Sequence, residues 1–284
     1  MKQKSLFIII IIISLSLLVS CTLKDDTVNV DKPINNFLTN YVQDYLSSST
    51  QGIDYNVVRG IKLLEEVDES IKLTNYLSIE DASNYINSLD YSYSSQFFVA
   101  AVMDKCYNMI STKPQELLKD LNEVDTWSIG YVYYALDYYG VNNELKNNLL
   151  NKLNVILEED YRDADYAGIC LCVTITEQID KTPFLDLIKS SVAVGGISTW
   201  GQVNAASTAT SIMGLLSEGI DLSQNYLDEE GNSLIYNLLK FEEDGAFKWV
   251  EDGPLDLSFS TPQGFLACVC YKVYLKTHEP VVVF

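Results

Sequence analysis

The residues best suited to acid–base chemistry lie together in the stretch YRDADYAGIC, which begins at residue 161. Asp163 and Asp165 stand one residue apart before an apolar run, between Arg162 and Tyr166. A carboxyl group can give a proton to a substrate if a dry cavity keeps it protonated. Alternatively, a carboxylate at this position caps a helix by accepting hydrogen bonds from free backbone N–H groups. The apolar run favours a cap, for which we expect Asp165, and leaves Arg162 beside Tyr166 as the place for any chemistry or ligand contact.

Residue counts exclude most other catalytic sets. His278 is the only histidine, which argues against His-based metal sites and Ser-His-Asp triads. Besides Cys21 there are five cysteines, none with C-x-x-C spacing, and an odd number cannot all pair. We expect buried free thiols and no metal site. The alternative is a bridge between the segments that carry Cys170 with Cys172 and Cys268 with Cys270.

Aromatic and amide-bearing residues offer a different kind of site. They stand at or before the starts of apolar runs, where helix ends and aromatic faces together could form the mouth of a ligand site. The predicted ligand-binding residues are Trp127, Tyr166, Trp200, Gln202, Asn204, Thr208, Trp249 and Gln263.

The elements that must position these residues are helices. Apolar residues recur at three-and-four spacing along the chain, and the only clear strand signal is the run 281–284. Four apolar runs resemble one another when Thr126, Asp165, Ser207 and Ser260 are aligned, at spacings of 39, 42 and 53 residues. Amphipathic helices lie between them. A repeat of two helices predicts a helical array, which closes on itself if the apolar helices face inward.

Three stretches carry a family resemblance: NAASTATSIMGLLSEGIDL from residue 204, DGAFKW from residue 244 and STPQGFLACVCYKVY from residue 260. They resemble the end of an α/α toroid, the fold of squalene cyclases, protein prenyltransferases and cobalamin carriers related to transcobalamin. The similarity covers about residues 163–274, and the N-terminal third matches only in its hairpin pattern. The resemblance implies an all-α fold, an α/α toroid of about five to six helical hairpins over residues 34–284.

The resemblance also bears on the sites. Cyclases of this superfamily use a D-x-D-D proton donor, which Asp163-Ala164-Asp165-Tyr166 matches except at the last position. Prenyltransferases hold zinc through Asp, Cys and His, but His278, the single histidine, lies beyond the last apolar helix. The Cys-Gly-Glu-Gln segment of thioester-containing toroids is absent. Trp200 and Trp249 are similar to the toroid tryptophans that brace successive hairpins, which is a structural alternative to ligand binding.

The first residues predict export. Two lysines precede the apolar run 6–19, which is too short to cross a bilayer comfortably, and LVSC at residues 18–21 resembles the lipobox of bacterial lipoproteins. We therefore expect a signal peptide at 1–20, lipidation at Cys21, a tether at 21–33 and a location on the extracytoplasmic face of the cell membrane. The formal net charge of −20 disfavours nucleic acid as a partner.

These features predict a membrane-anchored lipoprotein whose toroid binds a small molecule, a glycan or a protein without catalysis. No cofactor is required, and the carrier resemblance makes a cobalamin-like molecule one candidate ligand. The alternative is a terpene-cyclase-like or carbohydrate-lyase-like enzyme on the same scaffold. A third possibility is a structural or adhesion protein whose acidic face meets a protein partner.

Overall fold

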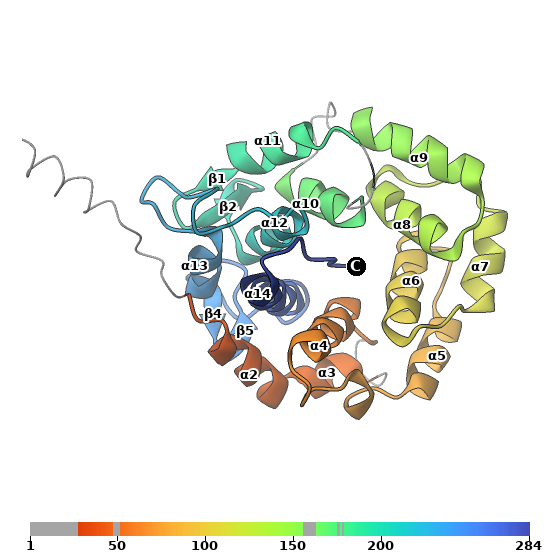
Figure 1. Cartoon of the computed structure of the whole chain (residues 1–284), viewed down its shortest axis with the longest axis horizontal. Coiled ribbons are helices and arrows are strands. Elements are labelled where there is room, and N and C mark those ends of the chain that lie inside the picture. Colours follow the sequence, from red (N-terminus) through yellow and green to blue (C-terminus); the bar gives the residue numbers. More distant parts are fainter. Residues whose placement is uncertain (1–27, 48–51, 156–162, 175–176, 178) are drawn as a thin grey trace, which may run out of the picture.

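The computed structural model describes residues 28–47, 52–155, 163–174, 177 and 179–284. Within these ranges the chain is mainly helical, so the predicted all-α class is confirmed (Figure 1). The signal peptide at 1–20 and the lipidation site Cys21 lie outside the described residues. None of the described helices is both long and apolar enough to cross a membrane.

Six helices surround the centre of the molecule, and they are named the inner helices here (Figure 1). Each contacts the next along the chain and the last contacts the first, so their contacts form a closed circuit. Most of these helices pack against neighbours on nearly every side, which explains why most of their sequences are apolar all round. The inner helices are α4 (Tyr55–Val67), α6 (Ser95–Tyr107), α8 (Ile129–Tyr139), α10 (Ala164–Val173), α12 (Ala205–Ser217) and α14 (Ser260–Thr277).

The remaining helices lie outside the inner ones (Figure 1). They are amphipathic because only one face meets the protein: α7, for example, buries Pro114 and Leu118 and exposes most of its other residues. Short 3-10 turns join some of them, η1 (Leu73–Asn75), η2 (Thr126–Ser128) and η4 (Leu239–Phe241). The outer helices are α2 (Asp31–Asn40), α3 (Val42–Leu46), α5 (Ile79–Ser88), α7 (Thr112–Lys119), α9 (Asn143–Val155), α11 (Thr182–Ser190) and α13 (Leu234–Leu238).

Two small antiparallel sheets precede α12 and α14. One contains β1 (Val192–Ala193), β2 (Gly196–Thr199) and β3 (Gln202–Val203), and the other contains β4 (Glu242–Glu243) and β5 (Ala246–Phe247). Two-residue turns join β2 to β3 and β4 to β5, and both residues of each turn have positive φ. That geometry is the preferred one for tight hairpins, and Asp-Gly at 244–245 is its strongest sequence signal.

The prediction of a strand at residues 281–284 is wrong. These residues form no strand, and the chain runs through them into the centre of the molecule (Figure 1). Phe284 is buried there against the rings of Tyr55 and Phe98. The guanidinium of Arg59 donates to the carbonyl oxygens of Val283 and Val282, each at 2.7 Å. The segment therefore belongs to the core.

The folded domain begins earlier than residue 34. Helix α2 starts at Asp31, inside the segment predicted as a tether, and Val30 is buried in the core. Val30 and Ile34 are both buried, so apolar contacts hold one side of the start of this helix against the protein.

Candidate ligand-binding site

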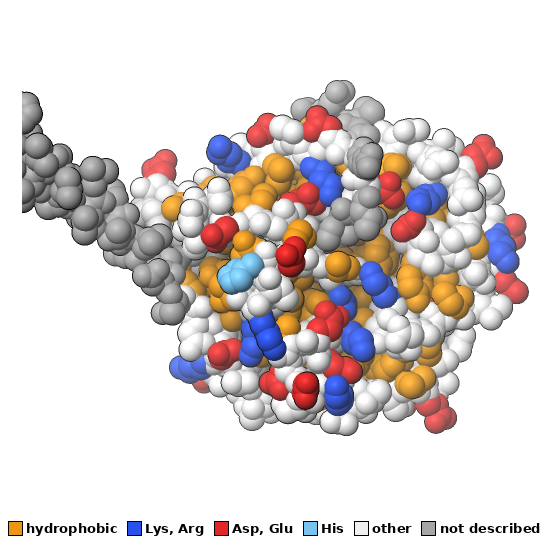
Figure 2. Space-filling view, in the orientation of Figure 1, with side chains coloured by type: hydrophobic (Ala, Val, Ile, Leu, Met, Phe, Trp, Pro, Cys, Tyr) orange, Lys and Arg blue, Asp and Glu red, His pale blue; other side chains and the backbone are white. Residues whose placement is uncertain are grey.

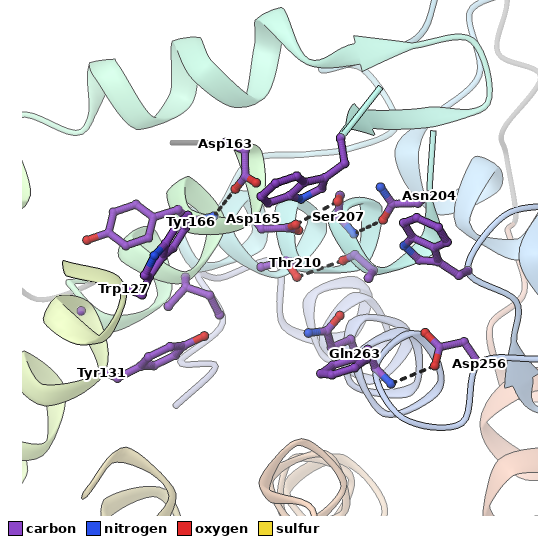
Figure 3. A pocket seen from close by; sticks show the side chains of 16 residues that line it. Trp127, Tyr131, Asp163, Asp165, Tyr166, Asn204, Ser207, Thr210, Asp256 and Gln263 are labelled. Atoms are coloured by element: carbon purple, nitrogen blue, oxygen red, sulfur yellow. Dashed lines mark hydrogen bonds between the residues drawn. The ribbon is translucent and has the colours of Figure 1, made fainter. Parts of the chain in front are cut away.

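A cavity of about 660 Å³ lies where the N-terminal ends of α8, α10, α12 and α14 meet (Figure 3). Its position follows from the fold, because these four inner helices begin at the same end of the molecule. Helices α10 and α12 are buried along their whole length except at Asp165 and Ala206, and both of these residues line the cavity. Six aromatic side chains also line it: Trp127, Tyr131, Tyr166, Trp200, Trp249 and Phe259.

Six of the eight predicted ligand-binding residues lie around this one cavity, although the sequence spreads them over more than 130 positions. They are Trp127, Tyr166, Trp200, Asn204, Trp249 and Gln263.

The other two predicted residues do not line the cavity. Thr208 is fully buried, where its hydroxyl accepts a hydrogen bond from Ile197 N and donates one to Asn204 O, so it joins β2 to α12. Gln202 is exposed on β3. Their sequence position beside Asn204 did not predict the directions of their side chains.

Several lining residues were not among the predicted ones. Tyr131 follows Trp127 by four residues, a spacing that places both on one side of a helical segment. Asp256 precedes the start of α14 in the manner of a cap, which is a recognisable signal. Phe259 carries no such signal, since it lies in an irregular segment and two thirds of it is exposed.

The capping prediction is corrected by the structure. Asp163, not Asp165, is the N-cap of α10, and its carboxylate accepts a hydrogen bond from Tyr166 N at 3.1 Å. Asp165 lies in the first turn, where its Oδ2 accepts a hydrogen bond from Ser207 Oγ on α12 at 2.9 Å (Figure 3). A cap must precede the first helical residue, and α10 begins at Ala164, two residues earlier than a cap at Asp165 would require.

The carboxyl group of Asp165 has an unusual environment. Its Oδ1 is buried and has no hydrogen-bond partner among the described residues. Burial raises the pKa of this carboxyl to about 7, and the charge of Asp163 reinforces the effect, while the hydrogen bond from Ser207 opposes it. Arg162, which was expected to act beside Tyr166, lies outside the described residues.

This pKa predicts how stability depends on pH. Because the folded chain retains the Asp165 proton between about pH 3.8 and pH 7 and the unfolded chain has lost it, Asp165 makes the fold less stable as pH rises through this window. Asp165→Asn cannot titrate, so its stability relative to the unmodified chain should increase by about 1 to 3 kcal/mol between pH 4 and pH 8. Urea denaturation at both pH values measures this difference. An equal difference at the two pH values would show that the carboxyl titrates normally.

Side chains also accept hydrogen bonds from backbone N–H groups at the starts of α12 and α14. Asn204 Oδ1 accepts from Ser207 N at 2.9 Å, so it caps α12. The carboxylate of Asp256 accepts from the backbone N–H groups of Phe259 and Ser260 at 3.2 and 3.0 Å. These bonds occupy backbone donors that a bound anion would otherwise use.

All three tryptophans are partly exposed. The exposed fractions are 47% for Trp127, 70% for Trp200 and 40% for Trp249. This exposure favours ligand binding by Trp200 and Trp249 over a role in bracing successive hairpins. Trp200 also has a φ of 55°, in the turn between β2 and β3. A bulky residue in this left-handed conformation is strained, and such strain often marks a functional position.

No described residues supply a metal site or a reactive thiol. Within the described ranges no group of three or more His, Cys, Asp or Glu residues could hold a metal ion. His278 ends α14 on the opposite face from the cavity, where acidic and basic side chains are interspersed (Figure 2). The five cysteines other than Cys21 are buried and form no disulfide with one another, as the sequence predicted.

Comparison with known proteins adds no family. No protein-family model matches the chain, and no curated protein and no solved structure matches it either. The function is therefore argued from the geometry of the cavity.

Proposed function

We propose that the chain is an extracytoplasmic, lipid-anchored α/α toroid whose cavity binds a small-molecule or glycan ligand without catalysis. One observation carries the binding proposal: all three tryptophans of the sequence meet at one cavity and are partly exposed there. Exposed indole rings leave apolar surface in contact with water, and covering that surface is a source of binding free energy. The lipid anchor at Cys21 is proposed from the sequence alone.

The polar lining supports the same proposal. The cavity volume lies within the range of sites for drug-sized ligands. Asp165 Oδ1 and Gln263 Oε1 are buried acceptors without partners among the described residues, so a ligand with donor groups would satisfy them. The closed circuit of contacts among the inner helices, with amphipathic helices outside, supports the toroid assignment. Cobalamin would have to bind without an imidazole, because the single histidine is remote from the cavity.

Tryptophan fluorescence tests the proposal directly, because every tryptophan reports on the cavity. The chain is titrated with vitamins, isoprenoids and neutral oligosaccharides, and Ala206→Phe serves to fill part of the cavity. We expect a ligand that changes the emission and binds at least tenfold more weakly to this variant, about 1.4 kcal/mol. Ile79→Phe, at an exposed position on α5 that does not line the cavity, is the matched control. Binding that is equally strong in both variants would place the ligand elsewhere.

Trp200→Asn separates binding from structural support. Asparagine tolerates the positive φ at this turn position better than tryptophan does, and Asn-Gly is a favoured turn pair. We expect the melting temperature to stay the same or rise, whereas ligand affinity falls because an exposed aromatic wall is removed. Thermal denaturation and fluorescence titration of the variant measure the two effects. A large loss of stability would instead indicate that Trp200 braces the successive hairpins.

An enzyme that uses Asp165 as a general acid is the second candidate. The carboxyl group of Asp165 suits this role because its pKa of about 7 lets it remain protonated near neutral pH, as a proton donor must. Its Oδ1 also has no hydrogen-bond partner among the described residues. If the cavity turns over an isoprenoid or a polysaccharide, Asp165→Asn should abolish turnover and leave binding measurable. Turnover that survives this substitution would dismiss Asp165 as the catalyst.

A further inference from the structure

We propose that the ligand of this cavity is a protonated organic amine with an apolar body. The inference rests on the proposed binding function and adds the chemical class of the ligand. It follows from three observations that concern charge, hydrogen-bond capacity and aromatic walls.

The charged side chains of the described lining are all acidic. Asp163, Asp165 and Asp256 line the cavity, and among the residues that the structure describes no lysine, arginine or histidine does. The face shown in Figure 2, where α14 ends, carries both acidic and basic side chains. Three carboxyl groups, with no basic side chain among the described lining residues, attract a positive ligand and repel a negative one.

The ends of the inner helices could in principle reverse this preference, because a helix N-terminus attracts anions. Here, however, side chains of the protein already accept hydrogen bonds from that end of α10, α12 and α14. Two of these capping groups, Asp163 and Asp256, are carboxylates, which offset the positive ends of their helices. An anionic ligand would therefore meet capped helices and negative side chains.

Two buried acceptors of the lining have no hydrogen-bond partner among the described residues. They are Asp165 Oδ1 and Gln263 Oε1, and both side chains line the cavity (Figure 3). The serine and threonine hydroxyls of the lining already donate within the protein, Ser207 to Asp165 at 2.9 Å and Thr210 to Ala206 O at 2.9 Å. A primary ammonium group carries three N–H donors and no acceptor, which matches this set.

The walls suit the rest of such a ligand. The faces of tryptophan, tyrosine and phenylalanine carry negative charge density that attracts cations, and tryptophan is the strongest of the three. Six aromatic residues at one cavity also bury an alkyl or aryl body. A neutral glycan can stack on the same rings, but each of its hydroxyls is both a donor and an acceptor. The two unpartnered acceptors of the cavity can bind the hydroxyl donors, but they offer nothing to the hydroxyl acceptors.

Binding of an amine should be linked to proton release from Asp165. The carboxyl is half protonated near pH 7, and an ammonium group pairs with its ionised form. Among the described residues, the other titratable groups that face the cavity are Asp163, Asp256, Tyr131 and Tyr166. Affinity for an amine should rise about tenfold between pH 6 and pH 8, while affinity for a neutral ligand stays constant.

Matched pairs of ligands test the inference. Octylamine is compared with octanol, phenethylamine with phenethyl alcohol, and adamantane-methylamine with adamantane-methanol, and maltotriose represents neutral glycans. Tryptophan fluorescence gives the dissociation constants at pH 6 and pH 8. We expect the best amine to bind at least tenfold more tightly than its alcohol at pH 8. Asp165→Asn should remove that preference, whereas Asp186→Asn, at an exposed position on α11 outside the cavity, should retain it.

The possible results are distinct. If alcohols or maltotriose bind as tightly as the amines, the cavity is a binding site and the amine inference is wrong. If no compound binds, both the inference and the proposed function fail. An amine preference that survives in Asp165→Asn would also overturn the inference, because the positive group would not pair with Asp165.

Discussion

Phe284→Ala is expected to lower the free energy of unfolding by about 3 to 5 kcal/mol, the usual cost of removing a buried phenylalanine. The ring is 1% exposed and lies within 5.0 Å of Phe98 between ring centres. Phe98 in turn contacts Tyr131, which lines the cavity, at 4.8 Å. Removing the ring leaves a void in the centre of the molecule that the surrounding helices cannot easily close.

Val282→Ala is the matched control for this prediction. Val282 lies two residues away in the same segment but is 46% exposed, so its truncation should change stability by less than about 0.5 kcal/mol. Urea denaturation monitored by circular dichroism gives both values. Equal effects of the two substitutions would mean that residues 281–284 do not occupy the centre of the protein.

Gly214→Ala is expected to cost about 2 to 3 kcal/mol, even though alanine is the better helix former by about 1 kcal/mol. A Cβ atom at Gly214 would lie 2.7 Å from Gly168 Cα and 2.8 Å from Gly168 O. Both neighbours are backbone atoms of a buried helix, so α10 and α12 would have to move apart. The two glycines thus set the distance between two helices that form the cavity.

Gly130→Ala tests whether the effect comes from close packing. Gly130 also lies in an inner helix, but an added Cβ there would meet Val173 at 3.6 Å and Cys170 at 3.8 Å, which is ordinary contact. We expect this variant to be as stable as the unmodified chain or more stable by up to about 1 kcal/mol. Destabilisation of the same size at both positions would argue against a special contact between α10 and α12.

The class of fold could be predicted because helical periodicity is local. Apolar spacing identified the helices. Asp165 and Ser207 are equivalent positions in the alignment of the repeats, and in the structure they are hydrogen-bonded to each other. The tight hairpins at 196–203 and 242–247 were missed, although Asp-Gly at 244–245 signals one of them. The run 281–284 has β propensity but packs in the core, because tertiary contacts override propensity.

The candidate site could be predicted in composition but not in detail. Aromatic and amide residues near helix starts fall together because the inner helices begin at the same end of the molecule. The distinction between Asp163 and Asp165 depends on where α10 begins, and helix ends are uncertain by a residue or two from sequence. The pairing of Asp165 with Ser207 and the burial of its second oxygen arise only from packing between helices.

A crystal structure of the chain with adamantane-methylamine at saturating concentration would show where the amine binds. We expect a ligand enclosed by Trp127, Trp200 and Trp249, with its nitrogen about 3 Å from Asp165 Oδ1. A cavity that stays empty while the amine binds elsewhere on the surface would contradict this expectation.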